Sequence, residues 1–284
     1  MRPRISIVVP CYNGAKYIRE TLDCLQKQTI DDWECVIVND GSTDNSLEIL
    51  KEYAAKDARY KYIDKENGGP AIARNTAIAA SSGKYILPLD ADDLIAPSYA
   101  EKAIDYLERH PNCKLVYCKL VYCKARFCGD RNDSVQLPIY NFFELPYENS
   151  IFCSCIYRRV DFDKTQGYNP NMVFRNEDWD FLLYLLTEKD EVFCIPEILF
   201  FYRQHGISRN HNIDEAYSLA NLQMIMNHPQ IYERDKKRTL EWVNPMFEYY
   251  KTELENILNS KTYKFGQVLF APVRWLKTKM RYIG

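Results

Sequence analysis

Between residues 5 and 89 the chain alternates short apolar runs with longer amphipathic stretches. The apolar runs are rich in β-branched residues and cover 5–9, 33–38, 60–63 and 85–89. Such runs are typical of strands that are buried on both faces of a sheet. A helix between two strands returns the chain to the same end of the sheet, so consecutive strands lie parallel. The alternation therefore predicts an α/β fold with a mixed, mostly parallel sheet flanked by helices.

The stretches between these runs carry helix signals. Residues 16–27 place their apolar side chains on one helical face. Ser42 or Asp44 can cap a second helix, and Pro70 can open a third that continues to about residue 80. These three helices would supply the crossover connections that a parallel sheet requires.

Beyond Pro97 the alternation changes. We expect a helix to residue 110, strands within 115–127 and 152–157, an irregular loop over the site at 132–149, a helix over 177–187, extended chain over 192–202, and helices from 213 to 258. This pattern divides the chain into a sheet domain over residues 1–210 and a C-terminal helical extension over 211–284.

The composition is that of an ordinary soluble protein. The chain has 284 residues, 46% of them hydrophobic, and a formal net charge of −2, so nothing favours nucleic acid as a partner. It has no apolar leader and no uncharged run of about 18 residues or more, so we expect neither export nor a membrane-spanning helix. Ten cysteines without an export signal indicate reduced thiols and a cytoplasmic protein.

A cluster of carboxylates follows the strand at residues 85–89. Asp90 and Asp92 are two residues apart, so they point the same way on an extended backbone, and Asp93 follows at once. Ligands of open α/β sheets bind beyond the carboxyl ends of the strands, and carboxylate oxygens suit Mg²⁺ or Mn²⁺. The alternative is an Asp-rich turn that caps the helix beginning at Pro97.

Polar groups suited to a nucleotide follow the first two strands. The ring of Tyr12 can stack on a base, and Asn13 with Gly14 permits a close approach of the backbone. Asp40 comes directly after the second strand, where a carboxylate can accept a hydrogen bond from a base or a ribose. The alternatives are an ordinary turn tyrosine and a structural Asp-Gly turn.

The turn at residues 67–70 precedes a helix. Its glycines can bring backbone N–H groups near phosphates, and Arg74 lies on the first turns of that helix. The alternative for Arg74 is a solvated surface arginine.

Five segments of the chain resemble the successive motifs of the family-2 glycosyltransferases, which have the GT-A fold. In order, they cover 5–13, 38–44, 69–75, 89–93 and 176–180. The resemblance extends over roughly residues 3–210 in the order and spacing of the family. It implies a Rossmann-like nucleotide-diphospho-sugar transferase domain over residues 1–210 and an inverting hexosyl- or N-acetylhexosaminyltransferase activity.

The resemblance assigns the donor nucleotide to residues of the first four motifs, with one addition from a later segment: Pro10, Tyr12, Asn13, Asp40, Arg74, Asp90 and Arg203. Tyr12 and Asp40 would hold the base, expected to be uridine, with Arg74 nearby. Asp90 would contact the ribose. Asp92 would bind the Mg²⁺ or Mn²⁺ that bridges the two phosphates of the donor.

The fifth motif is implied to supply the chemistry. Asp178 would be the general base on the acceptor hydroxyl, and Glu177 would orient the acceptor. The alternative is that both acids only interact favourably with the dipole of the helix they begin. An inverting transfer from an α-linked UDP-sugar would give a β-linked product.

Residues 203–208 resemble a late segment of many family members. His205 would be a further metal ligand and Arg203 a phosphate contact. The alternative for His205 is a solvent-facing histidine in a loop.

The end of the chain differs in composition from the rest. After Glu255 there are no acidic residues, and the basic residues alternate with apolar and aromatic ones: Lys261, Lys264, Arg274, Lys277, Lys279 and Arg281. This pattern favours a surface helix on anionic lipid, beside a lipid-linked acceptor. The alternative is a helix that docks on the domain with its lysines solvated.

Together these features predict a glycosyltransferase, peripheral at the inner face of the plasma membrane, that acts in the assembly of a cell-envelope polysaccharide. It would transfer a sugar from a nucleotide donor to a hydroxyl of a glycan or lipid-linked acceptor. The alternative is a non-catalytic relative that binds a nucleotide sugar or a glycan.

Overall fold

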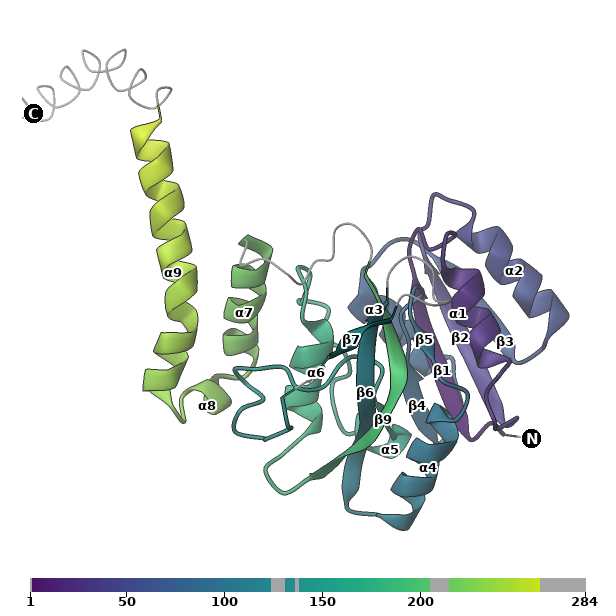
Figure 1. Cartoon of the computed structure of the whole chain (residues 1–284). Coiled ribbons are helices and arrows are strands. Elements are labelled where there is room, and N and C mark those ends of the chain that lie inside the picture. Colours follow the sequence, from purple (N-terminus) through teal and green to yellow (C-terminus); the bar gives the residue numbers. More distant parts are fainter. Residues whose placement is uncertain (1, 124–130, 136–137, 205–214, 261–284) are drawn as a thin grey trace, which may run out of the picture.

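This computed structural model describes residues 2–123, 131–135, 138–204 and 215–260 (Figure 1). The elements follow one another as β1 (Ile5–Cys11), α1 (Ile18–Leu25), β2 (Trp33–Asp40), α2 (Ser46–Lys56), β3 (Tyr60–Lys65), α3 (Pro70–Ala79), β4 (Tyr85–Pro88), β5 (Leu94–Ile95), α4 (Tyr99–Arg109), β6 (Cys113–Cys123), β7 (Arg131–Val135), β8 (Ile156–Arg158), α5 (Arg159–Phe162), α6 (Glu177–Leu185), β9 (Glu191–Arg203), α7 (Glu215–Asn227), α8 (Pro229–Tyr232) and α9 (Lys236–Asn259).

The first half of the sheet is parallel. Strands β3, β2, β1 and β4 lie side by side in that order, and β1 pairs with β2 from Ile5 opposite Trp33 to Cys11 opposite Asn39. Because all four strands run the same way, their carboxyl ends and the polar residues that follow them meet at one edge. The predicted α/β fold is confirmed.

The second half of the sheet is mixed. Within the described residues the order continues from β4 through β8, β6 and β9 to β5. Strand β8 is antiparallel to both of its neighbours, whereas β6 and β9 are parallel. The two-residue strand β5 pairs antiparallel with β9, Leu94 opposite Phe201. The carboxylate cluster is therefore held between β4 and β5, an arrangement that sequence analysis did not predict.

Two local predictions differ from the structure, and a third is made more detailed by it. The stretch at 132–149 is not irregular throughout, because β7 pairs with β6. The strand predicted at 152–157 is limited to Ile156–Arg158, which continues directly into the short helix α5. The helical stretch after residue 213 is divided among α7, α8 and α9, with Pro229 opening α8. These differences arise from strand pairing between residues distant in the sequence and from local interruptions of the helices.

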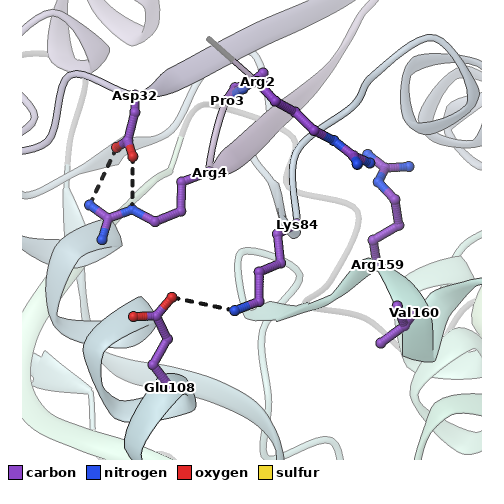
Figure 2. A pocket seen from close by; sticks show the side chains of 8 residues that line it. All are labelled: Arg2, Pro3, Arg4, Asp32, Lys84, Glu108, Arg159 and Val160. Carbon is purple, nitrogen blue, oxygen red and sulfur yellow. Dashed lines mark hydrogen bonds and ion pairs between the residues drawn. The ribbon is translucent and has the colours of Figure 1, made fainter.

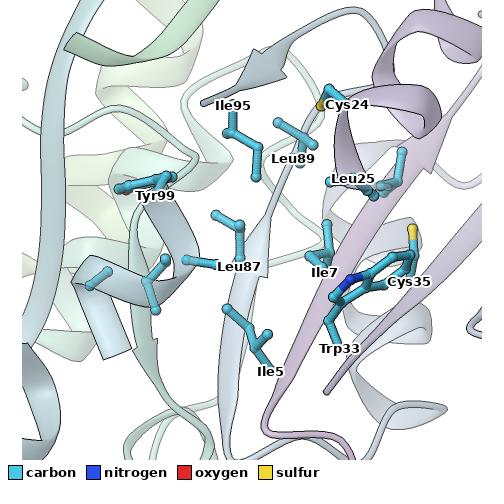
Figure 3. Close-up of a cluster of buried hydrophobic side chains, with 14 of the residues drawn as sticks. Ile5, Ile7, Cys24, Leu25, Trp33, Cys35, Leu87, Leu89, Ile95 and Tyr99 are labelled. Carbon is cyan, nitrogen blue, oxygen red and sulfur yellow. The ribbon is translucent and has the colours of Figure 1, made fainter. Parts of the chain in front are cut away.

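The core consists of two apolar layers, one on each face of the sheet. Successive strand residues point to opposite faces, so Ile7 and Leu87 join one layer while Val8 and Ile86 join the other. Figure 3 shows Leu87, Ile5 and Ile7 in the first layer, where Leu25 also lies. This two-sided burial explains why the strands are continuous apolar runs.

The C-terminal helices lie beyond the end of α6 (Figure 1). Helix α7 contacts both α8 and α9, and α9 extends away from the body of the protein. Among the described residues, none of the helices combines the length and apolar character that crossing a bilayer requires. The division at residue 210 stays a prediction.

Candidate active site

The loops after β1 and β2 are joined by side-chain hydrogen bonds. The backbone N–H of Asn13 donates to Ser42 Oγ over 3.0 Å, and Asn13 Oδ1 accepts from the N–H of Thr43 over 2.8 Å. Asn13 has a φ of +51°, in the left-handed region that asparagine tolerates better than most residues. Tyr12 lies beside this junction with 55% of its surface exposed, so its ring is accessible to a base.

Of the two caps predicted for α2, Asp44 accepts a hydrogen bond from the N–H of Ser46, the first residue of the helix, over 3.0 Å. The residue between them, Asn45, makes no side-chain capping bond. Asp44 also accepts from the N–H of Ala15 over 3.0 Å. These polar side chains therefore fix the first two loops against each other, beside the end of β1 where Pro10 lies.

Asp40 is buried at the end of β2, where it fixes the following glycine turn. Its carboxylate accepts from Lys65 Nζ over 2.6 Å and from the N–H groups of Gly68 and Gly69 over 3.0 and 2.8 Å. Gly69 has a φ of +86°, which few other residues adopt. Contact of Asp40 with a base stays a prediction, and Lys65 was not singled out from the sequence.

Arg74 joins two of the predicted motifs instead of facing solvent. The side chain is 3% exposed, Nη2 lies 2.6 Å from Asp90 Oδ1, and Nη1 lies 2.5 Å from Glu177 Oε1. Its guanidinium also lies over the ring of Tyr168. Burial alone would lower the pKa of Arg74, but the two carboxylates raise it well above its usual value. Arg74 is thus a fixed positive charge between the end of β4 and the start of α6.

Arg203, at the end of β9, holds the turn that follows Asp90. Arg203 Nε donates to the carbonyl oxygen of Asp92 over 2.7 Å, and its backbone N–H donates to Asp93 Oδ1 over 2.8 Å. Arg203 also pairs with Glu20 over 2.8 Å. Burial and then the charges of Asp92 and Asp90 raise the pKa of Asp93 well above its usual range.

These contacts define the position of Arg203 behind the carboxylate turn. The residue is 2% exposed, and its guanidinium lies over the ring of Tyr17. A side chain in this position holds the Asp92 turn, and direct contact with a phosphate stays a prediction. The neighbouring His205 lies outside the described residues.

The side chains near Asp92 fit a divalent cation that is bound largely by its substrate. In the parts of the chain that the structure describes, no three His, Cys, Asp or Glu side chains converge to form a metal cage. Mg²⁺ is commonly held by one or two carboxylates together with substrate phosphates. Asp92 is the carboxylate that the family resemblance assigns to this role, and Arg203 holds its backbone in place.

The predicted base lies at the start of α6. Asn176, with a φ of +66°, precedes the helix, and Asp178 Oδ1 accepts from the N–H of Trp179 over 2.9 Å. Burial and the charge of Glu177 raise the pKa of Asp178 to about 6, against the opposing charge of Arg74. A carboxylate with a pKa near neutrality is suited to accept a proton from a hydroxyl.

Two further residues of this region were not singled out from the sequence. Cys153 Sγ lies 3.5 Å from Asp90 Oδ2, so it covers the second oxygen of that carboxylate. Asp180, in the same motif as the base, is buried and lies 2.9 Å from His228 Nε2 and 2.8 Å from Asn227 Nδ2. Asp180 therefore anchors the base helix to α7 and α8. Asp180 could have been singled out from the sequence by its place in the base motif, two residues after Asp178.

A cavity of about 530 Å³ lies at the opposite, amino-terminal edge of the sheet (Figure 2). It contains two ion pairs, Arg4 with Asp32 over 3.0 Å and Lys84 with Glu108 over 3.4 Å. It includes none of the residues of the five motifs that follow the strand ends, so it is separate from the candidate site at the carboxyl edge.

The family comparison agrees with the arrangement at that edge. Residues 6–146 match the family model described as "Glycosyl transferase family 2". The chain belongs to glycosyltransferase family 2. The matched residues include the loops after β1 and β2, the glycine turn, Arg74 and the carboxylate cluster, whereas the base motif lies beyond them.

A relative of this family-2 chain is the uncharacterized glycosyltransferase EpsJ of Bacillus subtilis (strain 168). It is 42% identical over 110 residues, which cover 39% of this chain and 32% of EpsJ. This chain therefore matches about a third of the length of that relative.

Two solved structures share the fold. S. aureus TarS 1–349 in complex with UDP-GlcNAc matches with a TM-score of 0.62 and 22% identity over 80% of this chain and 66% of that one. Mannosyltransferase PcManGT from Pyrobaculum calidifontis, in complex with GDP-Man and Mn²⁺, matches with a TM-score of 0.55 and 17% identity over 95% and 85% of the two chains. The GT-A fold predicted for this family-2 chain is confirmed.

Proposed function

We propose that this chain is an inverting glycosyltransferase that moves a sugar from a nucleotide-diphosphate donor to a hydroxyl of its acceptor. The observation that carries the proposal is the connection Asp90–Arg74–Glu177, which holds the carboxylate turn beside the start of α6. It brings the predicted metal ligand Asp92 and the predicted base Asp178, 86 positions apart in the sequence, to one edge of the sheet.

The proposed donor is a UDP-sugar. Tyr12 is exposed beside the fixed loops after β1 and β2, where its ring can stack on a base. The carboxylate of Asp40 positions the glycine turn by accepting from its N–H groups. A base N–H would donate to this same carboxylate, which also accepts from Lys65. The complex of TarS with UDP-GlcNAc supports uridine, whereas PcManGT with GDP-Man keeps guanosine as the alternative.

Asp92 would hold a divalent cation, Mg²⁺ or Mn²⁺, against the donor phosphates. When bound, such an ion neutralises negative charge on the departing diphosphate. The protein contributes the position of Asp92, whose carbonyl is fixed by Arg203. The Mn²⁺ in the PcManGT complex supports the proposal that a divalent cation binds here. Donor hydrolysis with Mn²⁺ and with Mg²⁺ identifies the ion that this chain uses.

Asp178 is the proposed general base. As the acceptor hydroxyl attacks the anomeric carbon, Asp178 takes its proton, and the bond to the diphosphate breaks on the opposite face of the sugar. Inversion of the anomeric carbon follows from this single displacement. Glu177 is held by Arg74 and would orient the acceptor with its remaining oxygen.

A panel of nucleotide sugars tests the function directly. Release of the nucleoside diphosphate is measured with UDP- and GDP-sugars in the presence of Mn²⁺ or Mg²⁺, for wild type, Asp92→Ala and Asp178→Asn. We expect turnover of one donor, loss of metal-dependent hydrolysis in Asp92→Ala, and loss of transfer in Asp178→Asn.

The second candidate is a binding module without catalysis. If wild type binds a nucleotide sugar in calorimetry but releases no diphosphate under any condition, the catalytic proposal is wrong and the binding module stands. The raised pKa of Asp178 is compatible with catalysis, and the diphosphate assay decides between the two candidates.

The proposed acceptor is a glycan or a lipid-linked glycan of the cell envelope, reached from a membrane surface. The basic and aromatic residues after 260 support this placement. Sedimentation with phosphatidylglycerol vesicles tests it: wild type should pellet, and the variant with Lys277, Lys279 and Arg281 changed to Gln should not, while both keep donor hydrolysis. Wild type that stays in the supernatant would exclude membrane contact.

A further inference from the structure

The cavity at the amino-terminal edge of the sheet has an excess of positive charge (Figure 2). Its volume of about 530 Å³ is within the range that is common for small-ligand sites. Its charged lining consists of four cations and two acids: Arg2, Arg4, Lys84, Arg159, Asp32 and Glu108. Each acid is paired with one cation, Asp32 with Arg4 and Glu108 with Lys84. The positive charges of Arg2 and Arg159 are therefore the excess.

Neutral oxygen atoms hold the guanidinium of Arg159, the first residue of α5. Its Nε donates to the carbonyl of Gly83 over 2.7 Å, and Nη1 donates to the carbonyl of Ile78 over 3.1 Å. Its Nη2 donates to Ser81 Oγ over 2.6 Å. None of these three acceptors carries a negative charge, so Arg159 is fixed in position without being neutralised by them.

Arg2 lies beside Arg159. Its Nε donates to the carbonyl of Ser82 over 2.8 Å, and Ser82 stands between two of the residues that hold Arg159. Burial lowers the pKa of Arg159, the charges of Asp163 and Glu34 oppose this change, and the charge of Arg2 adds to the lowering. Within the described residues, neither arginine has a carboxylate at ion-pair distance. Two like charges therefore meet at one wall of the cavity (Figure 2).

We propose that Arg2 and Arg159 bind a phosphoryl dianion in this cavity. A guanidinium presents its N–H donors in a planar fork that matches the oxygen atoms of a phosphate. A dianion between the two arginines neutralises both charges and removes their repulsion. Pro3 and Val160, which also line the cavity, can contact the organic part of a phosphate ester. The donor site lies at the opposite edge of the sheet, so the proposal does not depend on the function proposed above.

Titration calorimetry of the full chain with inorganic phosphate, at about pH 8, tests the proposal. Wild type should bind with a dissociation constant of roughly 1 mM or lower. Arg2→Gln should raise this constant about tenfold or more, because it removes charge-assisted hydrogen bonds to the anion. Arg2 is exposed and makes one hydrogen bond to Ser82 among the described residues, so the variant should keep the fold.

The matched control is Arg109→Gln, which removes the same charge outside the cavity. Arg109 is on α4, with its side chain 74% exposed in a pair with Asp105. The control should bind phosphate as wild type does. Without phosphate, donor hydrolysis should be unchanged in Arg2→Gln, which separates a failure of this proposal from a failure of the proposed function.

Two further measurements identify where and from what source phosphate binds. The titration is repeated with saturating UDP, because phosphate can also enter a donor site. Binding that UDP abolishes and that Arg2→Gln leaves intact overturns the proposal. Vesicles of phosphatidic acid present the same dianion on a lipid: if free phosphate does not bind but Arg2→Gln weakens vesicle binding about tenfold, the source is a lipid headgroup. If Arg2→Gln changes neither phosphate nor vesicle binding, the proposal is wrong.

Discussion

The pKa of Asp178 is set by neighbours and burial that act in opposite directions. Burial and the negative charge of Glu177 favour the protonated form, whereas Arg74 favours the charged form, and the pKa comes to about 6. The same balance determines when the group can act as a base and how its charge affects folding.

The rate of transfer should therefore depend on pH through this group. A general base must be deprotonated, so kcat/KM should fall about tenfold per pH unit below about pH 6 and level off above it. The profile is measured with the preferred donor at saturating metal. A rate that stays flat down to pH 4.5 would remove Asp178 from the role of base.

Folding stability should show the opposite trend at the same residue. Because the folded pKa of about 6 exceeds the ordinary value of 3.8, the folded state binds more protons, and stability falls as pH rises between these values. The shift corresponds to about 3 kcal/mol, at 1.36 kcal/mol per pKa unit.

Asp178→Asn should remove this effect, since the amide carries no charge to bury. At pH 8 the variant should be more stable than wild type by up to about 3 kcal/mol, and near pH 3 the difference should vanish. Chemical denaturation at several pH values measures both. Equal stability at pH 8 would mean that the folded pKa is not raised.

At the scale of elements, the turn between β4 and β5 depends on β9. Arg203 comes from the end of β9, and its fork reaches the carbonyl of Asp92 and the carboxylate of Glu20 at once. A lysine keeps the charge but cannot reproduce this fork. Arg203→Lys should therefore loosen the turn that positions the proposed metal ligand.

The measurement is the metal concentration for half-maximal donor hydrolysis. In Arg203→Lys it should rise about tenfold, with the KM for the donor at saturating metal little changed. If the guanidinium binds a phosphate directly, the KM for the donor should rise instead and the metal requirement stay the same. Arg19→Lys, on α1 and in an exposed pair with Glu52, is the matched control and should change neither.

At the scale of the whole molecule, Arg74 ties the parallel half of the sheet to α6. One carboxylate partner is Asp90, just after β4. The other is Glu177, which lies 103 positions after Arg74 in the sequence. Removing one member of a buried ion network leaves the others uncompensated, which is more damaging than never forming it.

Arg74→Met should therefore destabilise the protein by about 3 kcal/mol, which lowers the Tm by roughly 5–10 °C. Adding Asp90→Asn and Glu177→Gln to the same chain should recover much of the loss, because no unpaired carboxylate then remains. Thermal unfolding of the four proteins, with the carboxylate double variant alone as the fourth, measures the coupling. Additive losses would mean that Arg74 acts through packing on Tyr168 and not through charge.

Most of the fold followed from the order of residues alone. The apolar runs of β1, β2 and β4 and the helices between them depend on periodicity and on residues such as Pro70, which act on their near neighbours. For the same reason the polar ends of these strands could be located, since parallel strands bring Tyr12, Asp40 and Asp92 to one edge whatever the details of packing.

The partners of those residues were decided only by the tertiary structure. The register of long-range pairs placed β5 beside β9 and so enclosed the carboxylate turn with Arg203. Burial in the space between β4 and α6 makes Arg74 a fixed cation between two carboxylates, partners that the sequence did not reveal. Sequence patterns report local preference and strand direction, whereas side-chain partners depend on packing between segments far apart in the chain. The sequence therefore determined where the candidate site lies, and the tertiary structure decided which charges meet there.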